Sequence, residues 1–443
     1  MATILFTVRP ERGHINPSLR IARTLQVRGH RVLYCGIPDI GELVRREGFE
    51  FAPIFEELFP VGFRDEMRAR LSRLRGWGRR REEHSLDRRY EAAQKCILEG
   101  EFDRPFARAR ADLLICDVLM QEPPLVAWGH HIPTLLLNTT LPLRREPGLP
   151  PLSSPLLPDG GAVSRARIAL TWLRVGGFTP LERWLEVPKV RYLHTLARKH
   201  GYPLEALDFS GENICARLPE LVLCPQEFAE LAVPRTRGEY LYVEPCIDYE
   251  RQEPDFPWER LEASRPLVFF SLGTLASTTR KAAPLLRAAV AAAAQRPGWQ
   301  LVLSLGGALT PEELGPLPAN VIAVPHAPQL RLLRRASVMV THGGFNSVKE
   351  CIHAGVPMVV LPLQHDQPGI SSRVVHHGLG VRLEPRRVTP SRLAHLVDTV
   401  LGTPGYKAAT EAMRVRFLEA EEKTGAAQVI ERFMDARGRP PTT

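Results

Sequence analysis

The chain has 443 residues, of which 44% are hydrophobic and 24% are charged, and its formal net charge is +9. These proportions are ordinary for a soluble globular protein of two or three domains, and no apolar run reaches the roughly 18 residues that a membrane-spanning helix needs. The seven cysteines, an odd number, include no C-x-x-C pair, so we expect a reduced, cytoplasmic protein. The first residues predict a β-strand and not a signal peptide.

The first 140 residues alternate short apolar runs with helical patterns. This alternation predicts βαβ units around a parallel sheet. The expected strands are 4–8, 31–35, 49–54, 113–116 and 134–137. The expected helices are 17–28, 64–75, 86–100 and one that begins at 124.

The segment 64–89 is rich in arginine. It contains ten Arg and five Asp or Glu, and so carries +5 of the net charge. Few aromatic residues lie between the arginines, which disfavours a nucleic-acid surface. We interpret the segment as a solvated helical face. The alternative is contact with anionic lipid headgroups, which would place the protein at the inner face of a membrane.

The middle of the chain is less regular. Residues 141–160 are rich in Pro and Gly and predict a loop, and residues 163–200 predict helices that carry Trp172 and Trp184. We interpret these helices as a cover over an acceptor cleft, with an ordinary packed insertion as the alternative. Residues 236–258 lack a clear period and contain three prolines, so we expect a linker there.

After the linker the alternation of strands and helices begins again. The expected strands are 267–272, 301–305, 321–324, 338–341, 358–361 and 380–383. We therefore predict an α/β fold of two Rossmann-like domains that face each other across a cleft, where ligands bind at the carboxyl ends of the strands. The predicted parts are a first domain, a linker, a second domain and a C-terminal helix that crosses back to the first domain, at 1–235, 236–258, 259–410 and 411–443.

A strand at 338–341 runs into a Gly-rich turn and then into a helix. Glycines let the backbone approach a ligand closely, and the free N–H groups at the start of a helix attract phosphate. Side chains in and after this turn can donate to a diphosphate or accept from ribose and sugar hydroxyls. They are His342, Gly343, Gly344, Asn346, Ser347, Glu350, Asp366 and Gln367. A tight turn alone would explain the glycines, but the full set predicts a diphosphate-sugar site.

The first domain offers an acid–base pair. We expect His14 in a loop after the first strand, with Asn16 as the cap of the following helix and Pro17 in its first turn. Asp117 ends the strand 113–116, at the same sheet edge. A carboxylate on one imidazole nitrogen fixes the tautomer, which lets His14 act as a general base on a hydroxyl.

Other catalytic motifs are absent from the sequence. It contains no P-loop, G-x-G-x-x-G, H-E-x-x-H or G-x-S-x-G pattern. It contains no D-x-D either, so we expect no metal and no bound cofactor. A helix N-terminus would then stabilise the diphosphate leaving group.

The segment from His342 to Gln367 resembles the donor signature of the family 1 glycosyltransferases, which are UDP-sugar transferases of the GT-B fold. The spacing matches as well as the residue types: Glu350 lies eight residues past His342, and Asp366 lies 24 past it. Gly13-His14-Ile15-Asn16-Pro17 is similar to the family's G-H-x-x-P motif, which carries the catalytic base. The segment 327–329 resembles its base-binding loop, and 271–274 resembles its second phosphate loop.

The resemblance implies a role for each matched position. His14 would be the base and Asp117 its partner. Glu350 would bind the ribose, Asp366 and Gln367 the sugar, and the backbone of Ala327 and Gln329 the nucleotide base. The diphosphate would be bound by Ser271, Gly273, Thr274, His342, Gly343, Gly344, Asn346 and Ser347. Where many members have a Trp that stacks on uracil, this chain has His326; UDP remains the expected nucleotide, with dTDP as the alternative.

The resemblance implies an inverting, metal-independent hexosyltransferase. Asp366-Gln367 favours a hexose such as glucose, delivered from a UDP-sugar. Residues 141–147 and 366–373 resemble the carotenoid (zeaxanthin) glucosyltransferase branch, and related enzymes act on polyketide and macrolide antibiotics. The expected acceptor is therefore a hydroxyl of a lipophilic natural product. The alternatives are a dTDP-deoxysugar transferase, a nucleotide-sugar isomerase (epimerase) of the same fold, and a non-catalytic binding protein.

Overall fold

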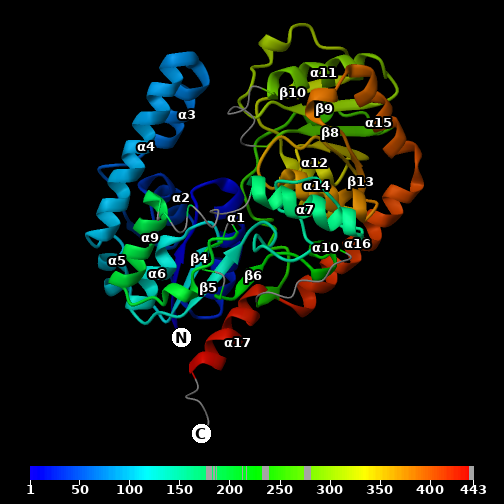
Figure 1. Cartoon of the computed structure of the whole chain (residues 1–443). Coiled ribbons are helices and arrows are strands. Elements are labelled where there is room, and N and C mark those ends of the chain that lie inside the picture. Colours follow the sequence, from blue (N-terminus) through cyan, green and yellow to red (C-terminus); the bar gives the residue numbers. More distant parts are fainter. Residues whose placement is uncertain are drawn as a thin grey trace.

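The computed structural model describes residues 1–175, 182, 185, 187–211, 213–215, 217–231, 239–273 and 281–438. Within these ranges the chain forms two parallel sheets, one in each half, with helices packed around each of them (Figure 1). This is the expected α/β arrangement of two Rossmann-like units. No helix in the described ranges is long and apolar enough to cross a bilayer.

The first sheet has the order β3-β2-β1-β4-β5-β6-β7 in the described part of the chain, and every neighbouring pair is parallel. Its central strands are mostly apolar and buried on both faces, as expected for parallel strands covered by helices. The strands are β1 Thr3–Thr7, β2 Arg31–Gly36, β3 Glu50–Pro53, β4 Leu113–Asp117, β5 Thr134–Asn138, β6 Glu220–Val222 and β7 Tyr240–Tyr242.

Helices and loops of the first half surround this sheet. The α3–α4 pair, which contains the arginine-rich segment, extends away from the sheet (Figure 1). The helices are α1 Arg12–Val27, α2 Gly41–Arg46, α3 Phe63–Arg73, α4 Gly76–Leu98, α5 Asp103–Ala109, α6 Glu122–Gly129, α7 Ala162–Val175, α9 Pro188–Lys199 and α10 Gln226–Ala229.

The second sheet has the order β10-β9-β8-β11-β12-β13 among the described residues and is also parallel. Its strands are β8 Leu267–Ser271, β9 Gln300–Ser304, β10 Val321–Val324, β11 Val338–Thr341, β12 Met358–Val360 and β13 Gly380–Arg382. Its helices are α11 Ala282–Ala294, α12 Gln329–Leu333, α13 Phe345–His353, α14 Gln367–His376, α15 Pro390–Gly402 and α16 Pro404–Lys423.

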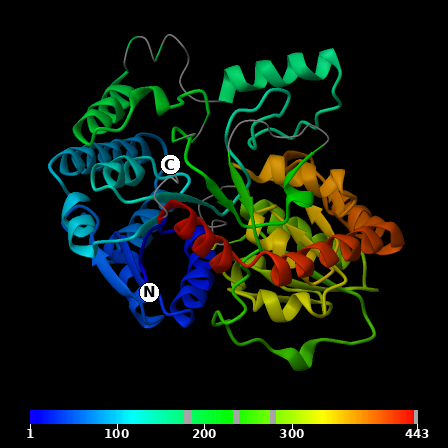
Figure 2. The same ribbon diagram turned by 90° about the horizontal axis from the view of Figure 1, so that it is seen from below.

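The chain crosses back to the first domain at its C-terminal end, as predicted. Helix α16 packs against the second domain, and α17 (Ala426–Gly438) continues onto the first domain (Figure 2). Ile430 of α17 is fully buried in the same apolar cluster as Leu25 of α1. Glu431 accepts hydrogen bonds from Arg28 and contacts His30 at 3.1 Å. Two helices with a break between them thus replace the single expected helix.

The first sheet has more strands than expected, because β6 and β7 join one of its edges. β7 lies inside 236–258, the range assigned to the linker. The helix between β6 and β7, α10, has only four residues, so this region lacks the alternation of strands with longer helices that predicts parallel strands. The boundary between the two domains stays a prediction.

Phe228 of α10, a residue of the first half, packs against aromatic residues of the second half. Its ring stacks on Phe345 at 5.6 Å and meets Phe417 edge-on at 6.2 Å between ring centroids. Phe345 is the first residue of α13, the helix that begins at the predicted diphosphate site. This contact fixes the start of that helix relative to the first domain.

Candidate functional site

A histidine and an aspartate meet at the carboxyl edge of the first sheet. Asp117 ends β4 and is fully buried, and its Oδ2 lies 2.6 Å from Nδ1 of His14. The other oxygen of Asp117 accepts a hydrogen bond from the backbone N–H of Leu119 at 3.0 Å. The carboxylate is therefore fixed on both oxygens, and it leaves Nε2, the other ring nitrogen of His14, directed away from it.

Thr139, which follows β5, is a second partner of the same imidazole nitrogen. Its Oγ1 lies 2.9 Å from Nδ1 of His14. Burial disfavours the charged ring, but the hydrogen bond and the negative charge of Asp117 outweigh it, so the pKa of His14 is raised above 6.5. An imidazole held in this way can take a proton from a hydroxyl at Nε2.

The start of α1 differs from the expectation. The helix begins at Arg12, and both Asn16 and Pro17 lie inside it. Asn16 is therefore not the cap, and His14 belongs to the first helical turn and not to a loop. The expectation relied on the preference of proline for the first position of a helix, where its missing N–H costs nothing.

One hydrogen bond at this helix start comes from the other domain. A proline inside a helix removes the hydrogen bond from its own nitrogen to the carbonyl four residues earlier. For Pro17 that carbonyl belongs to Gly13, and the side-chain amide of Asn346 donates to it at 2.8 Å. The two predicted sites, one in each domain, are thereby brought into direct contact.

His342 follows β11 and is packed between two glycines. A Cβ atom added to Gly273 or to Gly344 would lie within 3.0 Å of the imidazole, closer than real Cβ atoms approach. Burial lowers the pKa of His342 to about 4, although a hydrogen bond at the Ser271 backbone opposes the shift. The ring is therefore neutral at physiological pH and has a single N–H.

The first turn of α13 follows directly. Gly344 stands at its N-cap position without a side-chain capping bond, so the N–H groups of this turn are available to an anion. Ser347 is one of the predicted phosphate ligands, and its Oγ lies 3.2 Å from Nε2 of Gln329. Gly343 has a φ of +84°, and a Cβ there would collide with Val360, which explains the first glycine of the His342-Gly343-Gly344 motif.

Glu350, one turn further along α13, is already engaged. Its carboxylate forms a bidentate ion pair with Arg251, in which Nη2 lies 3.0 Å from Oε2, and Gln329 also donates to Oε2. Only 4% of Glu350 is exposed. The side chain of Gln329, expected at the nucleotide base through its backbone, thus holds the predicted ribose ligand.

Asp366 and Gln367 lie together at the carboxyl edge of the second sheet. Thr140 of the first domain donates to Oδ2 of Asp366 at 2.6 Å. Burial raises the pKa of Asp366, and the hydrogen bond from Thr140 opposes the shift. The side-chain carbonyl of Gln367 accepts from the N–H groups of Leu363 and Gln364 at 2.8 and 3.0 Å, which leaves its amide nitrogen to donate.

The remaining predicted site residues are less defined. Ser271 lies at the end of β8, and its Oγ accepts from the N–H of Gly273 at 3.3 Å. Thr274 lies outside the described residues, as does Trp184. Ala327 is partly buried and His326 is exposed. Within the described ranges no cluster of His, Cys, Asp or Glu has the arrangement of a metal site.

The structure describes only part of 163–200, the helical segment that was expected to cover an acceptor cleft. Trp172 of α7 is buried, and its Nε1 donates to the carbonyl of Leu149 at 2.7 Å. It therefore packs against the loop 141–160.

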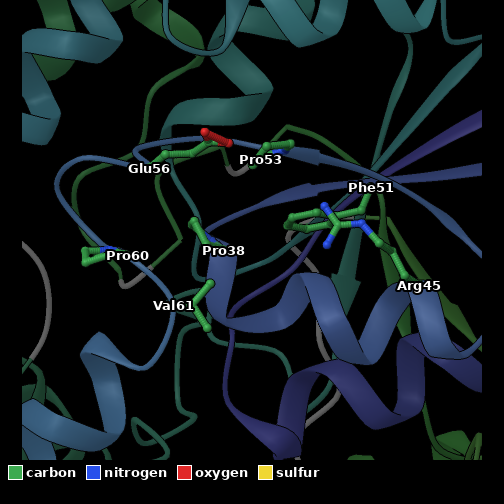
Figure 3. Close-up of a pocket in the computed structure, with 7 residues that line it drawn as sticks. All are labelled: Pro38, Arg45, Phe51, Pro53, Glu56, Pro60 and Val61. Carbon is green, nitrogen blue, oxygen red and sulfur yellow. The ribbon is translucent and has the colours of Figure 1, made fainter.

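A separate pocket of about 340 Å³ lies after β2 and β3, on the same sheet edge as His14 (Figure 3). It is mostly apolar and is lined by Pro38, Arg45, Phe51, Pro53, Glu56, Pro60 and Val61.

Three residues of the site were missed by the sequence reasoning. Thr139 and Thr140 follow β5, whose carboxyl end lies beside that of β4, so their position after a strand was the available signal. Arg251 lies in the segment interpreted as a linker. Nothing in the local pattern of that segment points to the ion pair with Glu350.

Comparison with known proteins supports these assignments at the level of family and fold. Residues 253–421 match the family model described as UDP-glucoronosyl and UDP-glucosyl transferase. The chain is 28% identical to demethyllactenocin mycarosyltransferase of Streptomyces fradiae, over 97% of this chain and 86% of that protein. It is 26% identical to zeaxanthin glucosyltransferase of Pantoea ananas, over 97% and 95% of the two chains.

Solved structures share the architecture across the whole chain. The crystal structure of the glycotransferase of kitacinnamycin has a TM-score of 0.69 and 26% identity, covering 97% of this chain and 98% of that one. The glycosyltransferase VinC in complex with dTDP has a TM-score of 0.67 and 21% identity, covering 98% and 100%. The two parallel sheets therefore form a GT-B fold.

Proposed function

We propose, from the premise that this chain belongs to the family 1 UDP-glycosyltransferases, that it transfers a hexose with inversion to a hydroxyl of a lipophilic natural product. The protein is a glycosyltransferase that uses nucleotide-diphosphate sugars. The proposal adds the catalytic residues, the stereochemistry, the sugar and the acceptor class.

The observation that carries the proposal is the contact between the two halves of the site. His14 is held by Asp117 at 2.6 Å, and the residue before it, Gly13, accepts a hydrogen bond from Asn346 at the start of α13. The proposed base thus lies next in sequence to a residue that is hydrogen-bonded to the proposed diphosphate-binding helix of the other domain. This is the arrangement that a single displacement at an anomeric carbon requires.

In the proposed step, Nε2 of His14 takes the proton of the acceptor hydroxyl. The hydroxyl oxygen forms a bond to the anomeric carbon as the bond from that carbon to the diphosphate oxygen breaks. Asp117 stabilises the imidazolium that results. The neutral His342, the N-terminus of α13 and the side chains of Asn346 and Ser347 stabilise the negative charge on the departing diphosphate.

The donor is a UDP-hexose or dTDP-hexose, with glucose as the first choice for the sugar. Asp366 can accept from sugar hydroxyls, and the amide nitrogen of Gln367 can donate to them. Relatives whose names specify a mycarosyl or a glucosyl transfer match this chain about equally well.

For the acceptor we propose a polyketide, macrolide or carotenoid alcohol. The names of relatives point to such acceptors. The apolar pocket after β2 and β3 supports the proposal, because it offers Phe51 and three prolines on the sheet edge that bears His14. A long apolar molecule can place one end there and a hydroxyl near Nε2.

Mass spectrometry of reaction products tests the proposal. Wild type and His14→Ala are incubated with UDP-glucose or dTDP-glucose and a panel of carotenoid and macrolide alcohols. A gain of one hexose that is absent with His14→Ala is the expected result. Conversion of the donor without an acceptor would instead identify an isomerase, and donor binding without any turnover would identify a binding protein.

A further inference from the structure

Three hydrogen-bond donors occupy the carboxylate of Glu350. Nη1 of Arg251 donates to Oε1 and Nη2 donates to Oε2, and the side-chain amide of Gln329 donates to Oε2 as well. Glu350 is 4% exposed, so protein groups and not bulk water set what this carboxylate can still accept.

The remaining capacity of Glu350 can be counted. An ionised carboxylate has about four acceptor positions, two on each oxygen. Among the described residues, Arg251 and Gln329 use both positions on Oε2, and Arg251 uses one on Oε1. One position remains, on Oε1. A ribose offers two neighbouring hydroxyl donors, at 2′ and 3′, whereas a 2′-deoxyribose offers one.

Arg251 is held in its place. Its Nη2 lies 3.7 Å from Glu253, and together with Glu350 and Asn346 it lines a cavity of only about 10 Å³ between the domains. Such a cavity has room for about one water molecule, so the guanidinium cannot retreat into it. Leaving the buried Glu350 without its cation is also unfavourable, although the Arg251 side chain itself is 22% exposed. These contacts favour a nucleotide that binds without displacing Arg251.

We propose that Arg251 makes the nucleotide site selective for 2′-deoxyribonucleoside diphosphate donors over ribonucleoside diphosphate donors. This inference rests on the proposed function, because it takes Glu350 as the residue that binds the pentose. The free position on Oε1 accepts the 3′-hydroxyl. A 2′-hydroxyl beside it loses its water and finds no acceptor on the carboxylate, and an unsatisfied polar group weakens binding. The donor is therefore of the dTDP type.

Calorimetric titration with four nucleotides tests the sugar and the base separately. The probes are UDP, dUDP, dTDP and ribothymidine diphosphate, and each pair that shares a base differs only at the 2′ position. We expect dUDP to bind about tenfold more tightly than UDP, and dTDP to exceed ribothymidine diphosphate by the same factor, which corresponds to about 1.4 kcal/mol. Equal or tighter binding of the ribonucleotides would overturn the proposal.

Substitution of Arg251 identifies the cause. Arg251→Met frees acceptor positions on both oxygens of Glu350, so the preference for the deoxynucleotides is expected to disappear or to reverse. Arg265→Met is the matched control, because Arg265 lies just after the segment 236–258 and, among the described residues, its side chain pairs with Glu262 at an exposed position. Its nucleotide preference should equal that of wild type. An unchanged preference in Arg251→Met would assign the selectivity to another residue.

A second variant covers the case in which Arg251→Met does not fold. Arg251→Lys keeps the charge but replaces the planar fork by one ammonium, which frees one acceptor position. It should reduce the preference for deoxynucleotides at an unchanged melting temperature.

The binding measurements also separate this inference from the proposed function. If none of the four nucleotides binds, the proposed function fails; if all bind without discrimination at 2′, only the role of Arg251 fails.

Discussion

The side-chain amide of Asn346 donates a hydrogen bond of 2.8 Å to the backbone carbonyl of Gly13, the carbonyl that Pro17 leaves without its helical partner. Gly13 directly precedes the proposed base, His14, and Asn346 lies in the first turn of α13, the helix proposed to bind the diphosphate. Because Pro17 has no N–H, the carbonyl of Gly13 can accept a hydrogen bond from the opposite domain. The contact couples the position of the base to that of the predicted phosphate ligand.

Replacing Pro17 by alanine should separate stability from activity. The new N–H competes with Asn346 for the carbonyl of Gly13, and a proline inside a helix costs up to about 3 kcal/mol. We expect a higher melting temperature and a kcat/KM lowered about threefold or more, the effect of weakening one hydrogen bond. In an Asn346→Ala background the substitution should no longer affect kcat/KM. An equal loss in both backgrounds would show that Pro17 does not act through Asn346.

The pH dependence of the reaction should report the pair of His14 and Asp117. The base must be neutral to accept a proton, and its pKa is raised above 6.5. The kcat/KM should therefore rise with pH through a pKa above 6.5 and then level off. Asp117→Asn removes the charge that raises this pKa, so the limb should move to lower pH while the plateau falls by about 10²- to 10⁴-fold. A limb that does not move would mean that another group titrates.

Much of the fold could be predicted, because its signals are local. Buried parallel strands such as β4, β5 and β11 are continuous apolar runs bounded by turn residues, and each lies within a few residues of its expected limits. The short strands β6 and β7 were missed, because the helix between them, α10, has only four residues and gives no helical period. The equally short β12 and β13 are separated by the ten-residue helix α14. The break between α16 and α17 was also missed.

The sequence indicates the candidate site best where the proposed residues lie close together in the chain. His342, Glu350 and Asp366 come from a single continuous segment, and the structure brings them to the carboxyl edge of the second sheet. The contacts of Arg251 with Glu350, of Thr140 with Asp366 and of Asn346 with Gly13 join segments about 100 to 330 residues apart. No local pattern encodes such pairs, so only the folded chain shows them.

Thr140 is expected to position Asp366, the residue proposed to bind the sugar. Thr140→Val removes the donor to Oδ2, leaves a buried carboxylate with fewer partners and raises its pKa further. The KM for the donor should rise about tenfold, since a hydrogen bond to a charged group contributes about 1.5–3 kcal/mol. Thr140→Ser keeps the hydroxyl and is the matched control. If both variants behave alike in initial-rate measurements, the hydroxyl has no part in sugar binding.

The close packing of His342 against glycine gives the sharpest steric prediction. A Cβ at Gly344 would collide with the imidazole, and the helix start behind it is fixed by the stacking of Phe345 on Phe228. The ring must therefore move. Gly344→Ala should weaken nucleotide diphosphate binding by about tenfold or more, because the hydrogen bond from His342 to the charged diphosphate is lost. Gly405→Ala is the control, since a Cβ there meets no atom within 4 Å. Calorimetry with UDP and dTDP measures both variants. Unchanged affinity in Gly344→Ala would remove His342 from the diphosphate site, because a ring displaced by its neighbour cannot keep the same contact.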